Sequence, residues 1–434
     1  MHSGTRTAPL SEGAEEDSFD DAAPPEPGVV AVFSGRAIGV PFVHGRPVGR
    51  EALAELGVKD DQMSREHFEL RADKRGLTLD DLKSRNGTFF GGARISSPVP
   101  VTAGDVVRAG RTLFVVVDDA RSFERAPPRL DGDEVRGPEL TKVLARAQAM
   151  SQLEQLLVVG ESGSGKEHVA RAFHGGDAKA PFVALNCASL QGGIVERLLF
   201  GARKGVYTGA EADAEGYVRA AEGGTLFLDE IAELDAAVQA KLLRFVETRE
   251  YFPLGDTRPR TAKVRICFAT LKGLEVEVEA HRFREDLFHR IATPIVHVPP
   301  LRERRAEIPL LIELEVRRHG GRVKPTIGFV ESALRSPWPG NVRQLRRTVV
   351  AALVAAELEG RATVGASDLP LVSANPAPAP APEPAPEAEA AIRAQPTDEE
   401  IERAVEAAAG NVSVAARALG IHRSKLRRWL ERKR

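Results

Sequence analysis

The sequence predicts a multidomain protein: an all-β sandwich, then an α/β domain with a helical extension, then a small all-α end. Three observations predict this order. Short alternating apolar runs occupy residues 28–120, buried strand-like runs alternate with helical patterns over 132–300, and a basic helical pattern follows a Pro/Ala-rich stretch. The chain has 434 residues, 42% hydrophobic and 28% charged, which excludes wholesale disorder and allows several cores.

The amino-terminal segment, residues 1–27, is acidic and rich in proline, so we expect a disordered tail. Apolar runs such as Leu113–Val117 are far shorter than the roughly 18 residues that cross a membrane, and no apolar leader is present. The only cysteines are Cys187 and Cys267, which excludes a disulfide scaffold. We therefore expect a cytoplasmic protein without a membrane partner.

The first domain is expected at residues 28–120, where the runs VVAVF, HFELR, LTLDD and TLFVVV are separated by glycine or charged clusters. Close spacing of short strands is typical of a β-sandwich. A polar joint, residues 121–134, follows the sandwich. The α/β region at 132–300 contains the strand-like runs LLVVG, PFVALNC, TLFLDE, VRICFAT and PIVHV. Residues 301–370 show a helical pattern, 371–396 a Pro/Ala-rich linker, and 397–434 a small helical end.

A phosphate-binding loop is the strongest motif of the chain. The run LLVVGESGSGKE places a buried strand directly before a glycine-rich turn that ends in lysine, and a helical pattern follows. Backbone N–H groups of such a turn wrap phosphates, and the lysine neutralises the β and γ oxygens of ATP. The candidate ATP-binding residues are Gly160, Glu161, Ser162, Gly163, Ser164, Gly165, Lys166 and Glu167. Glu167 stands where Ser or Thr usually meets Mg²⁺.

Two carboxylates end a second apolar strand, in the run GGTLFLDE. Asp229 is the candidate Mg²⁺ ligand, directly or through water, and Glu230 is the candidate group that orients or deprotonates the attacking water. The pair follows a phosphate-binding loop along the chain, so we predict ATP hydrolysis with Mg²⁺ as cofactor.

At this point the sequence resembles a known family. The motifs GESGSGKE, ALNCASL, GVYTGA, GGTLFLDEI, KLLRFVE, FREDLFHRI, PPLRER and WPGNVRQLR occur in the order seen in AAA+ domains of sigma-54-dependent transcriptional activators. The resemblance covers about residues 138–370 and, with the carboxyl-terminal end, about the last three hundred residues. It implies an AAA+ P-loop ATPase core at 132–300 with a helical lid at 301–370, and Glu167 is usual in this family.

The resemblance also implies roles for single residues. Asn186 would hold the catalytic Glu230 in an inactive pose, and Arg284 and Arg290 would be arginine fingers offered to the nucleotide of a neighbouring subunit. Arg343 would be the sensor arginine of the lid. The family usually has Asn in the sensor strand where this chain has Leu271, so Thr270 is the candidate for that function, or hydrolysis is slower.

The run GVYTGA resembles the family's GAFTGA loop, which contacts the sigma-54 factor. Glycines at both ends allow an exposed, mobile loop, and the aromatic ring gives a large apolar contact. Tyrosine replaces the usual Phe, and valine the usual Ala. The candidate contact residues are Gly205, Val206, Tyr207, Thr208, Gly209 and Ala210.

The β-rich domain carries Gly49-Arg50, Ser64-Arg65-Glu66-His67 and Asn86-Gly87-Thr88, in an order that resembles a forkhead-associated (FHA) domain. Such a sandwich binds phosphothreonine peptides through its loops, and arginine and hydroxyl groups suit a dianionic phosphate. The candidate phosphothreonine-binding residues are Arg50, Ser64, Arg65, Ser84 and Asn86. No receiver pattern of two-component systems is evident, so threonine phosphorylation is the predicted input.

Residues 411–434 contain eight basic residues and one acid, Glu431, a net charge of +7. Two helical patterns flank a Leu-Gly turn, which predicts a helix-turn-helix similar to the Fis-like ends of the same activators. The candidate DNA-binding residues are His422, Arg423, Ser424, Lys425, Arg427 and Arg428. The near-neutral total charge of −2 therefore hides a strongly basic end.

The leading hypothesis is an ATP-hydrolysing activator of sigma-54 RNA polymerase that binds upstream DNA as a dimer and assembles into a ring. The FHA domain would gate assembly by binding a phosphothreonine on a partner protein or on the chain itself. Two alternatives stay open: a DNA-bound, phosphopeptide-responsive scaffold with weak ATPase activity, and an AAA+ remodeller without a sigma-54 contact.

Overall fold

The computed structural model describes residues 26–370, except 34–35, 42–45, 75, 177–178, 190–192 and 207–211. The chain divides into two units, Met1–Val372 and Ser373–Arg434. The predictions for residues 1–25, for the linker at 371–396 and for the helix-turn-helix at 397–434 lie outside the described residues. Within the described part, no helix is long and apolar enough to cross a membrane.

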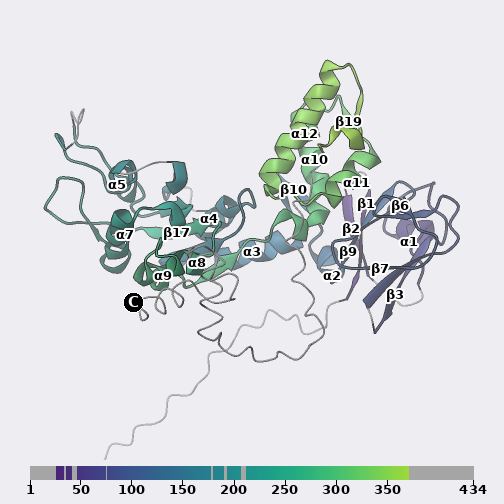
Figure 1. Cartoon of the computed structure of the whole chain (residues 1–434), viewed down its shortest axis with the longest axis horizontal. Helices are drawn as coiled ribbons and strands as arrows, with labels where there is room; N and C mark the ends of the chain where they lie inside the picture. Colours follow the sequence, from purple (N-terminus) through teal and green to yellow (C-terminus); the bar gives the residue numbers. More distant parts are fainter. Residues whose placement is uncertain are drawn as a thin grey trace, which may run out of the picture. The chain divides into compact units, whose positions relative to one another are not determined.

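The amino-terminal domain is a β-sandwich of two antiparallel sheets (Figure 1). The six-stranded sheet has the order β2-β1-β9-β8-β5-β6, with β1 (Gly28–Phe33), β2 (Arg36–Pro41), β5 (Thr88–Phe90), β6 (Ala93–Arg94), β8 (Val106–Ala109) and β9 (Thr112–Val117). The three-stranded sheet consists of β3 (Phe68–Asp73), β4 (Gly76–Asp81) and β7 (Val99–Val101). The predicted sandwich is confirmed. A short helix, α1 (Arg50–Glu55), was not expected.

The apolar runs of β1 and β9 lack polar alternation because both faces of these strands are buried. One set of alternate residues, which includes Val29 and Phe114, packs against Phe68 inside the sandwich. The other set, which includes Val30 and Val115, belongs to a second core that it shares with the helical lid. Burial on both faces makes continuous apolar runs the expected pattern for such strands.

The α/β domain contains a five-stranded parallel sheet in the order β13-β14-β17-β12-β18. Its strands are β12 (Gln155–Val159), β13 (Phe182–Asn186), β14 (Thr225–Asp229), β17 (Arg265–Thr270) and β18 (Ile295–His297), which confirms the five predicted runs. Its helices are α3 (Pro138–Ala149), α4 (Lys166–His174), α5 (Gly193–Phe200), α6 (Tyr217–Ala220), α7 (Ala236–Thr248), α8 (Leu274–Glu279) and α9 (Glu285–Ile291), and a small ladder joins β15 (Glu250–Tyr251) to β16 (Arg260–Thr261).

Separate cores lie on the two faces of this sheet. Leu156 and Val158 of β12 pack with α3 and α4, whereas Leu157 of the same strand packs with residues of α7 and α9. The side chains of a strand alternate between faces, so a strand covered on both sides is apolar throughout. The polar residues that follow the carboxyl ends of β12, β14 and β17 therefore lie together at one edge of the sheet.

The helical region contains α10 (Ile308–Arg318), α11 (Ile327–Arg335) and α12 (Asn341–Leu358), with the short strands β19 (Lys324–Pro325) and β20 (Thr363–Val364). The labels in Figure 1 identify these helices. The segment that we expected to be a polar joint is ordered: it forms α2 (Arg121–Arg125) and a hairpin of β10 (Arg129–Asp131) and β11 (Glu134–Arg136). Phe123 is buried, because the joint packs into the core that β1 and β9 share with the lid.

Candidate nucleotide site and its associated surfaces

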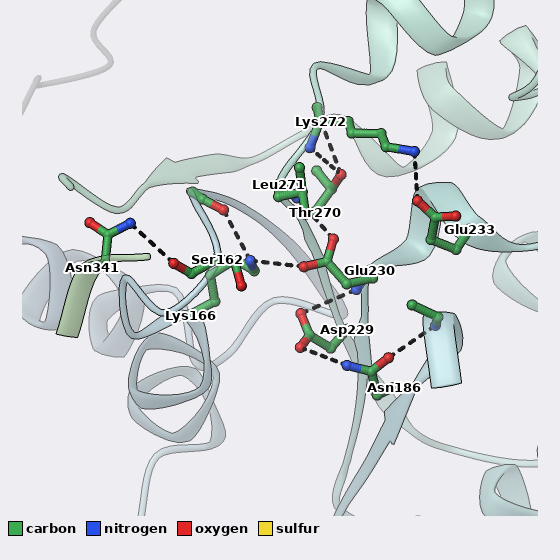
Figure 2. Close-up of polar contacts among 12 residues, drawn as sticks. Ser162, Lys166, Asn186, Asp229, Glu230, Glu233, Thr270, Leu271, Lys272 and Asn341 are labelled. Atoms are coloured by element: carbon green, nitrogen blue, oxygen red, sulfur yellow. Dashed lines mark hydrogen bonds and ion pairs between the residues drawn. The ribbon is translucent and has the colours of Figure 1, made fainter. Parts of the chain in front are cut away.

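A cavity of about 640 Å³ lies at the carboxyl edge of the parallel sheet, between the α/β domain and the lid. Its wall contains the phosphate-binding loop, the two carboxylates of β14 and the beginning of α12. The predicted residues that line it are Ser162, Gly163, Ser164, Gly165, Lys166, Glu167, Asn186, Asp229, Glu230 and Arg343. Parts of the chain that are far apart in sequence thus meet at one site, as Figure 2 shows for the polar contacts.

The phosphate-binding loop needs its glycines for two physical reasons. Gly163 and Gly165 have φ values of +73° and +107°, in the left-handed region that side chains with a Cβ rarely adopt. A Cβ on Gly163 would also lie 2.6 Å from the carbonyl oxygen of Gly340, which precedes α12. The loop is therefore shaped both by its own backbone and by the close approach of the lid.

Lys166 begins α4, and its side chain is almost fully buried. Its Nζ atom donates to the carbonyl oxygen of Gly160 at 3.0 Å and to Glu230 at 3.2 Å. The nearby Ser164 hydroxyl is one of two buried side-chain polar atoms without a hydrogen-bond partner among the described residues. A buried ammonium and an unsatisfied hydroxyl in a glycine-rich loop suit a phosphate ligand.

Asp229 and Glu230 leave the end of β14 with different contacts. Burial, together with the charge of Glu230, raises the pKa of Asp229, although Lys166 opposes the shift. Glu230 adopts a φ of +57°, and its carboxylate accepts from Lys166 and from the backbone N–H of Leu271 at 3.2 Å (Figure 2). The two adjacent carboxylates of the cavity thus have different surroundings. Such a difference is needed if Asp229 is to bind an ion while Glu230 acts as a base.

The Asn186 amide donates to Asp229 at 3.4 Å, and its oxygen accepts from the N–H of Ala188. The expectation placed this amide against Glu230, whereas the described contacts of Glu230 are with Lys166 and Leu271. Asn186 and the carboxylates therefore share one polar cluster, and the proposed restraint of Glu230 stays a prediction.

The environment of Thr270 in the sensor strand differs from the expectation that this side chain would sense the nucleotide. Thr270 is fully buried, and its hydroxyl donates to the carbonyl of Lys272 and accepts from the N–H of that residue. It therefore closes a turn and does not line the cavity. The backbone N–H of Leu271, whose side chain is exposed, makes the contact with Glu230. A backbone donor is available whatever the side chain, which is why leucine is compatible with this position.

The residues of this site fit a magnesium ion bound together with nucleotide phosphates. Asp229 supplies a carboxylate oxygen, the donor type that Mg²⁺ prefers, and it lines the same cavity as the phosphate-binding loop. Within the described part, no group of three or more His, Cys, Asp or Glu forms a metal site. Mg²⁺ in nucleotide sites is usually held by one or two carboxylates plus phosphates and water.

The lid holds the phosphate-binding loop through several side chains, of which sequence reasoning missed Asn341 and Arg302. Asn341 is fully buried and donates to Glu161 at 3.0 Å and to the carbonyl of Ser162 at 3.1 Å. Arg302 forms an ion pair with Glu161 at 2.7 Å. Burial acts to raise the pKa of Glu161, but the hydrogen bonds from Asn341 and Arg302 outweigh it and lower that pKa. Arg343 bonds the Ser162 hydroxyl at 3.0 Å, where the sensor arginine was expected.

A buried ion pair stands behind the loop. Arg304 donates to the carbonyl of Ser164, and it pairs with Glu307 at 2.8 Å. Glu307 also accepts from the N–H of Gly137 at 2.9 Å. Burial raises the pKa of Glu307, although Arg304 opposes the shift. The two residues occur in and after PPLRER, a motif quoted for the family without a role, so the signal was present in the sequence.

The cavity wall also contains apolar side chains. Val135, Leu140, Leu311, Leu314 and Val342 line it, and His168 pairs with Glu134 at 2.7 Å. Apolar walls with a few polar groups are typical of ligand pockets. Sequence reasoning gave these residues no role in the site, and Glu134 ended the segment that was expected to be a polar joint.

Arg284 and Arg290 lie on a different surface and do not line the cavity. Arg284 precedes α9 and forms an ion pair with Asp286 at 2.6 Å, and both arginines are exposed. The structure therefore places these residues outside the nucleotide site of their own subunit, while the nucleotide site is built from the sheet edge and the lid.

Comparisons with known proteins agree with this architecture. Residues 135–297 match the sigma-54 interaction domain, 47–110 the FHA domain, 302–385 the AAA+ ATPase lid domain, and 398–432 the Fis family of bacterial regulatory proteins. The transcriptional regulatory protein ZraR of Escherichia coli is 37% identical over 305 residues, which cover 68% of this chain and 68% of ZraR. The chain belongs to the sigma-54-dependent transcriptional regulators.

Two further relatives define how far the similarity extends. The hydrogenase transcriptional regulatory protein HoxA of Bradyrhizobium diazoefficiens is 41% identical over 292 residues, 64% of this chain and 59% of HoxA. A crystal structure of NtrX from Brucella abortus with ADP has a TM-score of 0.51 at 29% identity and covers 69% of each chain. The chain spans about three fifths of the length of the first curated relatives it matches. The chain therefore contains an AAA+ ATPase domain.

The loop that we predicted to contact the sigma-54 factor is described only at its base. Gly205 and Val206 belong to the described residues, whereas Tyr207, Thr208, Gly209 and Ala210 lie outside them. Arg203 forms an ion pair with Asp213 at 2.5 Å across the base of this loop. A Cβ on Gly255 would lie 2.2 Å from the side chain of Val206, so a second loop, 252–259, packs closely against the first.

The FHA loops converge at one end of the sandwich. Arg50 is exposed at the start of α1, and its N–H donates to the carbonyl of Ser64 at 2.9 Å. A Cβ on Gly49 would lie 2.0 Å from the carbonyl oxygen of Arg65, which explains the glycine. Asn86 is exposed and donates to the carbonyl of Gln62 at 2.7 Å. Arg50, Ser64, Arg65 and Asn86 therefore surround one accessible surface.

Ser84 differs from the expectation for a phosphate ligand. Its side chain is buried, and its hydroxyl donates to Asp81 at 2.6 Å. Thr88 donates to the same carboxylate at 2.6 Å. Burial acts to raise the pKa of Asp81, but the hydrogen bonds from Ser84 and Thr88 lower it overall. Ser84 thus stabilises the loop that presents Asn86.

Proposed function

We propose that this regulator hydrolyses ATP with Mg²⁺ to remodel sigma-54 RNA polymerase at promoters, while it is bound to an upstream DNA site. The observation that carries the proposal is the cavity in which Lys166, Asp229 and Glu230 converge below the lid. Lys166 would stabilise charge on the β and γ phosphates, and Glu230 would orient and accept a proton from the attacking water. Asp229 would hold Mg²⁺, which when bound would supply positive charge to offset that of the phosphates.

Assembly into a ring would complete each site. Arg284 and Arg290 are exposed and lie apart from the cavity of their own subunit, which supports their action on the nucleotide of a neighbour. Arginine groups that approach the γ phosphoryl raise hydrolysis rates by about 10³–10⁵ in related enzymes. The loop Gly205–Ala210 would then transmit hydrolysis to the sigma-54 factor.

The FHA domain would control this activity by binding phosphothreonine. Arg50, Ser64 and Asn86 offer a cation, a hydroxyl and an amide on one surface, which supports binding of a dianionic phosphate and the peptide next to it. The basic residues at 422–428 would bind DNA as part of a dimeric Fis-like end. Their neutralisation of phosphates predicts binding that weakens steeply with salt.

The decisive experiment is transcription from a sigma-54 promoter with purified full-length protein and ATP, with and without a phosphothreonine peptide. We expect transcripts that depend on ATP, on Lys166 and on the upstream site. ATP turnover without any transcript would favour a remodeller without a sigma-54 contact, and the absence of turnover at any protein concentration would favour the scaffold. A Thr208→Ala variant with normal ATPase activity and no transcript would support contact through the loop.

A further inference from the structure

The outer face of the FHA sheet is buried in the structure, although it is remote in sequence from the residues that cover it. Val30 and Val32 of β1 and Leu113 and Val115 of β9 belong to one hydrophobic core with α10 and α11 of the lid. The members of this core from the lid include Ile308, Leu311, Ile312, Val316, Phe329 and Leu334. An apolar sheet face of this kind would be unfavourable in water, so its burial accounts for the valine-rich pattern.

Polar contacts fix the position of this face. Arg108 of β8 forms an ion pair with Glu331 of α11 at 2.8 Å, and both side chains are largely buried. Arg305, just before α10, donates to the carbonyl of Gly104. Arg305 is partly buried at this contact, and burial lowers the pKa of its guanidinium. Desolvated, directed bonds specify one relative position of two surfaces more sharply than apolar packing does.

Arg108 also contacts β5, the strand that follows the predicted phosphopeptide-binding loop. Arg108 lies opposite Phe89 in the pairing of β8 with β5, and its guanidinium is 3.8 Å from the centre of the Phe89 ring. Phe89 follows Asn86-Gly87-Thr88 directly in the chain. Arg108 therefore contacts β5 on one side and the lid on the other.

The lid in turn connects this contact with the nucleotide site. Glu331 lies on α11, whose residue Ala333 accepts a hydrogen bond from the buried indole of Trp338 at 2.7 Å. Three residues after Trp338, Asn341 donates to the phosphate-binding loop. A small shift of α11 would thus move groups that hold Glu161 and Ser162.

The interface between the FHA sheet and the lid is not completely filled by side chains. A cavity of about 580 Å³ is lined by Val32 and Leu113 of the FHA sheet and by Ile312 and Val316 of α10. Empty space lowers the cost of sliding one surface over the other, because fewer close contacts are lost.

We propose that the FHA face formed by β1, β8 and β9 is a binding surface for the lid of the same chain. In the second part of the proposal, phosphothreonine binding changes, through Arg108 and Glu331, how the lid holds the nucleotide site. The second part rests on the proposed function of the FHA loops. Those loops remain accessible, because Arg50 and Asn86 are exposed. The FHA domain thereby has one surface for the phosphopeptide and another for the ATPase.

A charge exchange on the full-length protein tests the surface itself. The variants are Arg108→Glu, Glu331→Arg and the double variant, with Arg322→Glu as the matched control, because Arg322 forms an exposed ion pair with Glu357 within the lid. Hydrogen–deuterium exchange of residues 106–117 and 327–335 should accelerate about five-fold or more in each single variant. The double variant should recover most of the protection, and the control should match wild type. Unchanged exchange in both single variants would overturn the binding surface.

The coupling has a separate measurement. A library of short phosphothreonine peptides, with unphosphorylated counterparts, is titrated while peptide affinity and the KM for ATP are followed. Coupled sites typically change each other's affinity about five-fold or more. Wild type should show such a change in KM, and Arg108→Glu should lose it while binding peptide with the same affinity. A full response in Arg108→Glu would overturn the coupling. Absence of peptide binding in wild type would overturn the proposed FHA function and its coupling, whereas the exchange experiment still decides the lid surface.

Discussion

The phosphate-binding loop of the ATPase and the loops of the FHA domain both offer positive charge to a phosphate, but they are built differently. Lys166 is buried, and the loop around it is held by groups from distant parts of the chain, among them Arg304 and Asn341. Arg50 is exposed, and the loops around it are held by bonds within the FHA domain. Catalysis needs a desolvated and rigid site, whereas reversible peptide recognition needs an accessible one.

We expect the largest effect from the proposed arginine fingers, which lie outside both sites of their own subunit and would stabilise charge on the γ phosphoryl of a neighbour's nucleotide. Arg284→Ala should lower the ATPase kcat by about 10³-fold. A mixture of this variant with Lys166→Ala should regain activity, since one subunit would supply the finger and its neighbour the intact cavity. Steady-state turnover over a range of mixing ratios measures this, and a mixture no more active than its components would contradict action between subunits.

The rigidity of the ATPase side depends on its buried ion pair. Arg304→Met leaves the carboxylate of Glu307 buried without its partner, which should destabilise the ATPase domain by about 3 kcal/mol. Removing both charges in Arg304→Met/Glu307→Leu should recover most of that loss. Thermal unfolding of the three proteins tests the comparison, and equal melting temperatures would show that the pair does not stabilise the loop.

For the accessible FHA site we expect the opposite behaviour: loss of its arginine should weaken binding without changing stability. Arg50→Ala should weaken phosphothreonine-peptide binding about ten-fold or more, because a charge-assisted hydrogen bond to the phosphate is lost. Since Arg50 is exposed, the melting temperature should stay that of wild type. Fluorescence anisotropy with a labelled peptide measures the affinity, with Arg46→Ala as the control for an exposed arginine in the same domain. Unaltered affinity would remove Arg50 from the peptide site.

The smallest expected effect is the change in stability caused by Asp229→Asn. It separates the contribution of Asp229 to ATP hydrolysis from its contribution to the stability of the nucleotide site. Burial raises the pKa of Asp229 above its ordinary value of 3.8 in the folded protein, so the folded state binds more protons than the unfolded state in that window. Stability without nucleotide should therefore fall as the pH rises from 3.8 through the raised pKa. Asp229→Asn should lack this dependence, be more stable by about 1 kcal/mol at neutral pH, and lose ATPase activity. Denaturant titrations at several pH values test the sign.

The sequence predicted much of the fold and part of the site, because some signals are local. Strand runs, the glycine-rich turn and the carboxylates after β14 depend on neighbours in the chain, and all lie where they were expected. The failures have a common cause. The segment at 121–134 was expected to be a polar joint, but its hairpin and Phe123 are stabilised by contacts with the lid, which lies far along the sequence.

The same distinction applies to single side chains. The sequence alone determined that Lys166, Asp229 and Glu230 would meet, since parallel strands bring their carboxyl ends to one edge of a sheet. Only the tertiary structure decided that Thr270 and Ser84 have structural hydrogen bonds and that Leu271 contacts Glu230 through its backbone. The same holds for Val30 and Val32 of β1, which face the lid. Hydrogen-bond partners and burial depend on residues distant in the chain, and no local pattern encodes their distance in space.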